Sequence, residues 1–252
     1  PNTCGLFEAD IVKISELAHK SGGYLYCDGA NFNAVVGKLK PGDLGIDAMH
    51  INLHKTFSTP HGGGGPGSGP VVFSNRLEKF CPTPLVKNIK GDFILVEDSN
   101  EKDLTKSFGR LNVFHGQMGM FVRAMSYMLS HGADGLKQVS EDAVLNANYL
   151  RASLSSHLTP AFDGFCMHEI LFSDDFLKDT GVETLDFAKA MIDEGYHPMT
   201  IYFPLVIHGA LLVEPTETES KQSLDHFINT LCDLVERLKK DSDSFKAAPV
   251  FT

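Results

Sequence analysis

Apolar residues at helical spacing alternate with short β-prone segments in the first third of the chain. Asn2 or Thr3 can cap a helix whose apolar face ends before Gly22 and Gly23. Strands are predicted at residues 24–27, 46–53 and 70–74, from runs of β-branched and aromatic residues or from alternation of apolar and polar positions. A helix, a strand, a connection and two further strands indicate part of an α/β sheet.

The pattern changes twice further along the chain. Residues 82–103 mix prolines with an acidic-polar cluster and predict a surface excursion. Two helices are predicted at 118–131 and 136–156, and we interpret them as a bridge to a second domain. Beyond them, strands at 165–172, 200–206 and 210–213 and helices at 184–194 and 218–240 predict a small α+β domain. We place the boundary near residue 160, giving domains 1–160 and 161–252.

The composition limits the possible partners. Of the 252 residues, 42% are hydrophobic, which is enough for a sizeable core. The net charge of −10 argues against nucleic-acid binding, and the lack of a long apolar run argues against a membrane partner. Five widely spaced cysteines predict reduced thiols rather than a disulfide framework. We therefore expect a soluble protein, and its start resembles a cut within a domain.

The most informative stretch follows the predicted strand at 46–53. It carries His54 and Lys55 at the strand end, and six of the eight residues at 62–69 are glycine. A Walker-type phosphate loop is excluded because its lysine follows the glycines instead of preceding them. Gly62, Gly64 and Gly67 match the spacing of a dinucleotide fingerprint, but no convincing helix opens behind them. A lysine after a strand can instead form a Schiff base with an aldehyde cofactor, most commonly pyridoxal phosphate.

That cofactor chemistry needs an acid to pair with the pyridinium nitrogen, and Asp28 is the candidate. It lies at the end of the predicted strand at 24–27, so two neighbouring parallel strands would bring Asp28 and Lys55 to one crevice. Asp28 could also be a turn former. Ala30 would pack against the cofactor ring. Further candidates for contacts to the cofactor or its phosphate are the polar residues Asn31, Asn52, His54 and Thr56. His54 could instead form only a hydrogen bond within the sheet, and Thr56 could instead stabilise a turn.

The segments around Asp28 and Lys55, with those at 166–169, 197–205 and 214–221, resemble glycine decarboxylase. This is the pyridoxal-phosphate-dependent P-protein of the glycine cleavage system, and the likeness is to its C-terminal half or to the second subunit of two-subunit forms. The resemblance implies an aspartate-aminotransferase-like (fold type I) large domain, here only in part, followed by a small α+β domain. It also implies a complementary N-terminal half or first subunit, and an oligomer.

The resemblance implies a reaction as well. Glycine loses carbon dioxide at the cofactor, and the lipoyl arm of H-protein takes up the aminomethyl group. We expect His61, Gly63 and Gly64 to shape the mouth for that arm. Arg110 and Arg123 are candidates for binding the substrate carboxylate. His168 and Glu169 suggest a metal, but no second ligand pair has zinc spacing, so we expect none.

Two other functions stay open. They are a different pyridoxal-phosphate decarboxylase or lyase, and a non-catalytic fragment or subunit that needs its partner to bind the cofactor. The expected location is the cytoplasm of a bacterium, or the mitochondrial matrix if the source is eukaryotic.

Overall fold

The chain forms two compact units. The structure, a computed structural model, describes residues 1–61, 63, 67–97 and 106–250. Residues Ala9–Leu136 form one unit, called here the lysine unit, and Pro1–Glu8 with Lys137–Thr252 form the other, the C-terminal unit. The predicted boundary near residue 160 stays a prediction. None of the helices in the described ranges has the length and apolar character needed to cross a lipid bilayer.

Helix α1 (Ile11–Lys20) begins later than the sequence pattern predicted. The side chain of Asn2 does not cap it; the Asn2 carboxamide oxygen instead accepts hydrogen bonds from the N–H groups of Cys4 (3.0 Å) and Leu6 (3.2 Å). A local turn of this kind competes with helix formation. The residues before α1 are therefore an irregular segment, and the predicted capping role of Asn2 was wrong.

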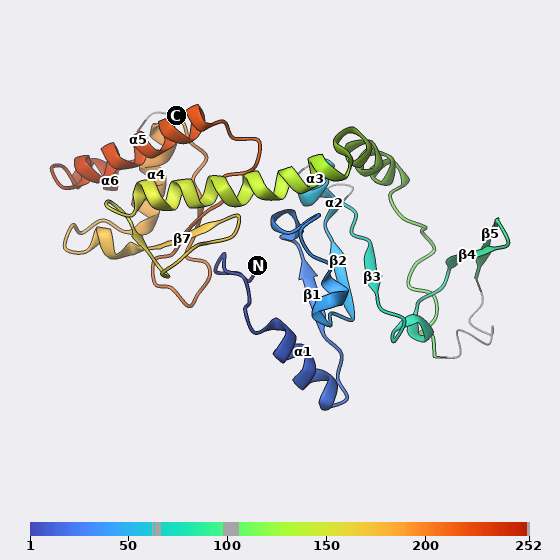
Figure 1. Cartoon of the computed structure of the whole chain (residues 1–252). Coiled ribbons are helices and arrows are strands. Elements are labelled where there is room, and N and C mark those ends of the chain that lie inside the picture. The colour runs from blue at the N-terminus through green and yellow to red at the C-terminus, as the bar shows by residue number, and fades with distance from the viewer. Residues whose placement is uncertain (62, 64–66, 98–105, 251–252) are drawn as a thin grey trace. The chain divides into compact units, whose positions relative to one another are not determined.

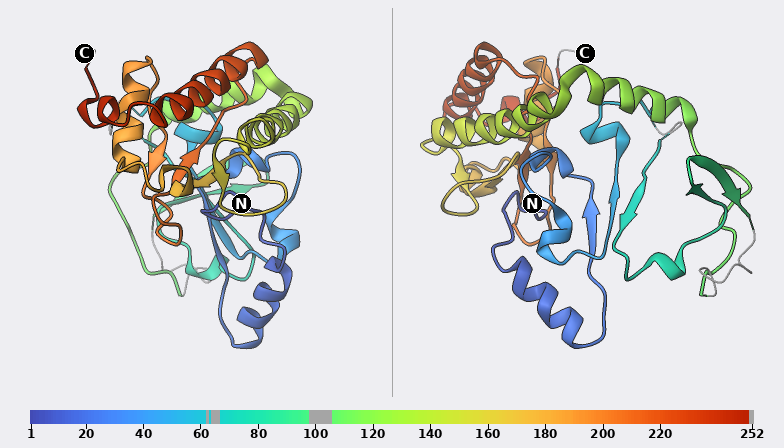
Figure 2. Two further views of the ribbon diagram at one scale, coloured as in Figure 1. Left: turned by 90° about the vertical axis from the view of Figure 1, so that its left-hand side faces the viewer. Right: turned by 45° about the vertical axis from the view of Figure 1, so that its right-hand side comes forward.

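A three-stranded sheet forms the centre of the lysine unit (Figures 1 and 2). Strand β1 (Tyr26–Gly29) pairs in parallel with β2 (Ala48–Ile51), and β2 pairs antiparallel with β3 (Val71–Phe73). All three strands were predicted: β1 begins and ends two residues later than the predicted strand 24–27, and β2 and β3 are shorter than the predicted strands 46–53 and 70–74. The shorter helices of this unit are η1 (Phe32–Ala34), η2 (Pro41–Leu44), α2 (Leu53–Thr56) and η3 (Glu78–Phe80).

Asp47 fixes the start of β2. Its side chain is buried, and its carboxylate accepts hydrogen bonds from the Leu25 N–H (2.9 Å) and from Arg76 (3.0 Å), and lies 2.7 Å from His19 Nε2. Burial raises the pKa of Asp47, but these hydrogen bonds and the charge of Arg76 outweigh that effect, so the pKa lies below its ordinary value. One carboxylate therefore ties α1, β1 and the chain after β3 to the entrance of β2.

The predicted surface excursion at 82–103 contains a hairpin that the sequence reading missed. Strands β4 (Leu85–Ile89) and β5 (Asp92–Val96) pair antiparallel. Lys90 and Gly91 between them both have positive φ, as a two-residue hairpin turn of the mirror-image type requires. These two short apolar strands were not predicted because the prolines and acidic residues around them are typical of a loop. Residues 98–103 of this stretch lie outside the described residues.

Helix α3 (Met118–Leu154) follows the hairpin. It breaks its helical geometry at Gly132, where φ is 64° and ψ is −174°. The two predicted helices, 118–131 and 136–156, correspond to its two parts. An L residue with a side chain rarely adopts this φ, so glycine permits the break.

The C-terminal unit is an antiparallel sheet packed with helices. The strand order is β6-β7-β9-β8. Its strands are β6 (Thr159–Pro160), β7 (Ile170–Ser173), β8 (Thr200–Ile201) and β9 (Leu211–Val213), and its helices are η5 (Asp174–Leu177), α4 (Thr184–Asp193), α5 (Lys221–Leu238) and α6 (Asp243–Ala247). The second part of α3, strands β7 and β9, and helices α4, α5 and α6 share one apolar core. The predicted α+β architecture is thus observed, although β8 stops early because Tyr202 turns to a positive φ of 57°.

Candidate active site

The parallel pairing of β1 and β2 brings the two predicted key residues to one edge of the sheet. Asp28 is aligned with His50, and Gly29 with Ile51, in the parallel register. After Ile51 the chain passes through Asn52 into α2, which carries Lys55. Because the carboxyl ends of parallel strands meet at the same edge, Asp28 and the turn that carries Lys55 share that edge, where α/β folds bind ligands.

Gly29 lets the two strands approach. A Cβ atom at this position would lie 1.9 Å from the carbonyl oxygen of His50 and 2.6 Å from Cε of Met49. No side chain fits at these distances. The residue after the acid therefore has to be glycine for a structural reason, which the strand pattern alone could not reveal.

Asp28 lies in a small polar network that the sequence reading did not include. Its Oδ1 accepts the Ala30 N–H (2.9 Å) and lies 3.2 Å from His50 Nε2. The same Nε2 lies 3.2 Å from Asn52 Oδ1, and His50 Nδ1 lies 2.7 Å from the Tyr26 hydroxyl. Since Nε2 faces two acceptors, the proton belongs there, and Nδ1 accepts from Tyr26. Strand alternation places Tyr26 and Asp28 on one face, and this could have pointed to the network.

Lys55 is exposed, but its backbone is firmly held. Leu53 and Phe57, on either side, are buried in the core of the lysine unit, where Ala124 of α3 joins them. The Lys55 N–H donates to the Asn52 carbonyl (3.2 Å), and the Lys55 carbonyl accepts the Ser58 N–H (3.2 Å). The amine is thus presented to solvent from a fixed turn. The sequence predicted a strand up to Leu53, whereas β2 ends at Ile51 and a short helix carries the lysine.

Buried polar atoms without a hydrogen-bond partner among the described residues surround this turn. They are Nδ1 of His54 and Oγ1 of Thr56 and Thr59. Such orphaned groups are uncommon in folded proteins and indicate a ligand or ordered water. Burial lowers the pKa of His54, and the neighbouring His61 and Lys55 lower it further, so His54 is neutral at pH 7. The predicted sites at His54 and Thr56 thus contain groups suited to an anionic, hydrogen-bonding ligand.

The glycine-rich loop is described only in part. Gly63 has a positive φ of 66° and open space around it, while Gly64 lies outside the described residues. A Cβ at Gly67 would lie 3.6 Å from His54 Nδ1, so the end of the loop runs past that ring. The His61 ring packs edge-on against His54, with centroids 5.0 Å apart. The predicted function of this loop stays a prediction.

Two other predicted residues have local roles. Asn31 precedes η1, where its carbonyl accepts the Ala34 N–H (3.4 Å). The guanidinium of Arg110 lies 3.1 Å from a carboxylate oxygen of Glu97. Arg110 would therefore have to leave this ion pair to bind a substrate carboxylate.

The parallel strand pair that carries Asp28 and leads into the lysine-bearing turn agrees with the aspartate-aminotransferase-like fold (fold type I of the pyridoxal-phosphate enzymes) expected from the sequence. The solved structures agree. A glycine decarboxylase (P-protein) in inhibitor-bound form matches with a TM-score of 0.72 at 22% identity, over 89% of this chain and 51% of that one. Aspartate aminotransferase from Thermus thermophilus matches with a TM-score of 0.64 at 15% identity, over 94% and 62%. At these identities the likeness establishes the fold alone.

The sequence comparisons are more specific. Residues 139–248 match the family model described as glycine dehydrogenase, C-terminal domain. The chain is 64% identical to a probable glycine dehydrogenase (decarboxylating) subunit 2 from Caulobacter vibrioides, over 99% of this chain and 48% of that protein. It is 53% identical to the protein of the same name from Kosmotoga olearia, over 100% and 51%. The resemblance drawn from the motifs is confirmed, and the chain spans about half the length of these curated relatives.

Proposed function

We propose that this chain is the lysine-bearing part of a glycine decarboxylase. In complete form the enzyme would decarboxylate glycine with pyridoxal phosphate and transfer the aminomethyl group to the lipoyl arm of H-protein. The observation that carries the proposal is the position of Lys55 and Asp28 at one edge of a parallel strand pair. The identity of 64% to a probable glycine dehydrogenase (decarboxylating) subunit 2 supports this reaction over others of the fold.

The residues at this edge fit the cofactor. The Lys55 amine would hold it covalently, and the Asp28 carboxylate would pair with its ring nitrogen. His54 and Thr56 offer a neutral imidazole and a hydroxyl, each with a buried atom that has no hydrogen-bond partner among the described residues. When bound, pyridoxal phosphate supplies an electron sink for the electron pair left by the departing carbon dioxide.

In this proposal, Asp28 keeps the ring nitrogen of the cofactor protonated. A carboxylate beside the ring nitrogen favours the protonated form, because opposite charges attract. The Ala30 N–H and His50 Nε2 both contact Oδ1 and hold the carboxylate in place. His50 and Tyr26 are thus positioning residues, because they act through Asp28.

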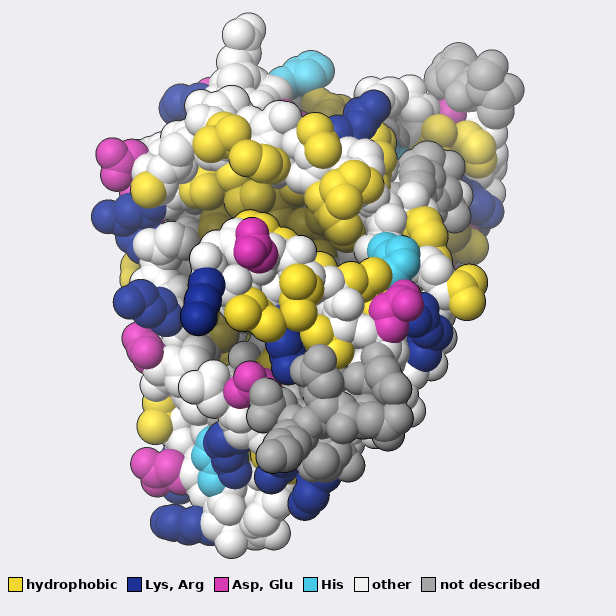
Figure 3. Space-filling model, turned by 90° about the vertical axis from the view of Figure 1, so that its right-hand side faces the viewer, with side chains coloured by type: hydrophobic (Ala, Val, Ile, Leu, Met, Phe, Trp, Pro, Cys, Tyr) yellow, Lys and Arg dark blue, Asp and Glu magenta, His cyan; other side chains and the backbone are white. Residues whose placement is uncertain are grey.

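The exposed side chains of the lysine unit suggest that a complementary part of the complete enzyme covers them. Asp28 is 72% exposed, and the sheet residues Tyr26, Val71 and Phe73 on its face are exposed as well. Further apolar side chains of the lysine unit are exposed, among them Phe93, Leu111 and Val113, and Figure 3 shows apolar side chains gathered on one face of the molecule. Soluble proteins rarely leave this much apolar surface uncovered, and decarboxylation benefits from a poorly solvated site. We propose that the N-terminal half or first subunit of the enzyme covers this surface in an oligomer.

Borohydride trapping of added pyridoxal phosphate, followed by peptide mass mapping, tests the cofactor site. We expect an adduct on Lys55, either in the chain alone or only with its complementary part. The Lys55→Arg variant should lose the adduct, while the control Lys40→Arg, on an exposed lysine, should keep it. Labelling of other lysines with Lys55 unmodified in both samples would refute the assignment.

Glycine–bicarbonate exchange tests the reaction. Exchange that depends on lipoylated H-protein supports glycine decarboxylation. An adduct on Lys55 with no exchange in the complete enzyme would favour another pyridoxal-phosphate decarboxylase or lyase. The absence of any adduct, even with the complementary part, would favour a non-catalytic subunit.

A further inference from the structure

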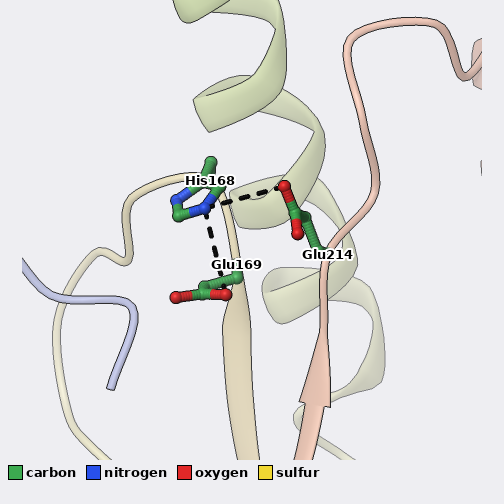
Figure 4. A group of neighbouring side chains, drawn as sticks. All are labelled: His168, Glu169 and Glu214. Carbon is green, nitrogen blue, oxygen red and sulfur yellow. Dashed lines mark ion pairs between the residues drawn. The ribbon is translucent and has the colours of Figure 1, made fainter. Parts of the chain in front are cut away.

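Three side chains of metal-binding type meet at the ends of paired strands in the C-terminal unit. His168 and Glu169 directly precede β7, and Glu214 directly follows β9. The antiparallel register, which aligns Ile170 with Val213, brings the two ends together. Figure 4 shows the three side chains pointing toward one another. His168 Nε2 lies 3.9 Å from Glu169 Oε2 and 3.7 Å from Glu214 Oε1, and one donor atom from each residue lies within 4.8 Å of the others.

Burial and charge make this cluster more than a surface ion pair. The side chain of His168 is fully buried and that of Glu169 is 6% exposed, whereas that of Glu214 is 43% exposed. A divalent cation between the three side chains would interact favourably with both carboxylates, and more strongly in this largely buried place than in water.

The donor set and its spacing fit a small divalent ion. Imidazole and carboxylate are ligands of zinc, with bonds of about 2.0–2.2 Å, so tetrahedral neighbours would lie about 3.4 Å apart. The separations from His168 Nε2 are 3.7 and 3.9 Å, and the donor atoms of all three residues lie within 4.8 Å of one another, so the side chains would have to contract around the ion. Glu214 also lines a pocket of about 570 Å³ and is partly exposed, so an ion can reach its carboxylate from solvent.

The backbone around the cluster is tightly fixed. The Met167 N–H donates to the Gly5 carbonyl (2.7 Å), and a Cβ at Gly5 would lie 2.4 Å from the Glu169 carbonyl oxygen. The segment before α1 is therefore packed against the residues that directly precede β7, which include His168 and Glu169. Fixed backbones keep donor atoms in place before a metal arrives, which favours binding.

We propose that His168, Glu169 and Glu214 bind a divalent metal ion, preferably zinc, that joins the ends of β7 and β9. The ion would act as a structural link, independent of the chemistry at Lys55. The search for zinc spacing in the sequence could not find this site, because Glu214 comes from a separate strand.

The test uses the full chain, free of any histidine tag and treated with a chelator. We expect it to take up about one Zn²⁺ per chain by elemental mass spectrometry after dialysis. In competition with a chromophoric chelator, Glu214→Gln should bind zinc at least about 10-fold more weakly. The matched control is Glu217→Gln, which removes the same charge from the same segment and should bind like the unmodified chain.

Thermal unfolding gives a second readout. With zinc at about 100 times its Kd, the Tm of the unmodified chain and of Glu217→Gln should rise by about 5 °C or more. The Tm of Glu214→Gln should not respond. Because Glu214 is partly exposed, this variant should fold even if substitutions of the buried His168 do not. Equal zinc affinity in both variants, or a Tm of the unmodified chain that does not change with zinc, would overturn the proposal.

Discussion

Replacing Gly29 with alanine would force a methyl group between β1 and β2. The new Cβ would lie 1.9 Å from the His50 carbonyl oxygen, whereas ordinary van der Waals contacts begin at 3.4 Å. The strands would have to move apart by about 1.5 Å, which breaks hydrogen bonds that need donor–acceptor distances of about 3 Å. The obstacle is backbone rather than a flexible side chain, so local relaxation cannot remove it.

The expected cost combines two effects. Overpacking costs about 1–3 kcal/mol, and each lost ladder hydrogen bond adds about 1 kcal/mol. We therefore predict that Gly29→Ala lowers the free energy of unfolding of the lysine unit by about 3–5 kcal/mol. The site should suffer as well, because Asp28 and its partner His50 lie at the same point of the register.

Urea unfolding and amide hydrogen exchange measure the effect. The amides of β1 and β2 should exchange faster in Gly29→Ala, and the pyridoxal-phosphate adduct on Lys55 should be reduced. Gly42→Ala is the matched control, since no heavy atom lies within 4 Å of a Cβ at that position. The control should change stability by no more than about 0.5 kcal/mol. If Gly29→Ala is as stable as this control and keeps its amide protection, the steric argument is wrong.

Two further predictions concern carboxylates. Asp28→Asn keeps the shape of the side chain but removes its negative charge. If the chain acts as proposed, H-protein-dependent exchange in the complete enzyme should fall about 100-fold or more while the Lys55 adduct persists; unchanged exchange would remove Asp28 from the proposed mechanism. For Asp47, whose pKa is lowered in the folded chain, the stabilisation is present above its ordinary pKa of about 3.9 and is lost as pH falls through the lower folded value. Unfolding between pH 5 and 2 should therefore depend less on pH in Asp47→Asn than in the unmodified chain or in Asp43→Asn, and identical profiles would contradict the assignment.

The sequence by itself determined the features that depend on local order. The spacing of apolar residues is set by 3.6 residues per helical turn, so the helices α4 and α5 were predicted within a few residues of their observed bounds. The order of strands, with Asp28 and Lys55 after neighbouring ones, followed from short runs of β-prone residues. The motifs around these two residues were specific enough to indicate glycine decarboxylase.

Only the tertiary structure decided which residues meet across strands. His50 joins Asp28, and Glu214 joins His168, because of pairing registers that no local pattern encodes. The need for glycine at position 29 arises from the neighbouring backbone, which is distant in sequence. Strand pairing brings together residues that are far apart along the chain, and the periodicity of each segment holds no information about its partner. The periodicity of the sequence therefore predicted where helices and strands lie, whereas the packing of the strands determined which side chains meet at each site.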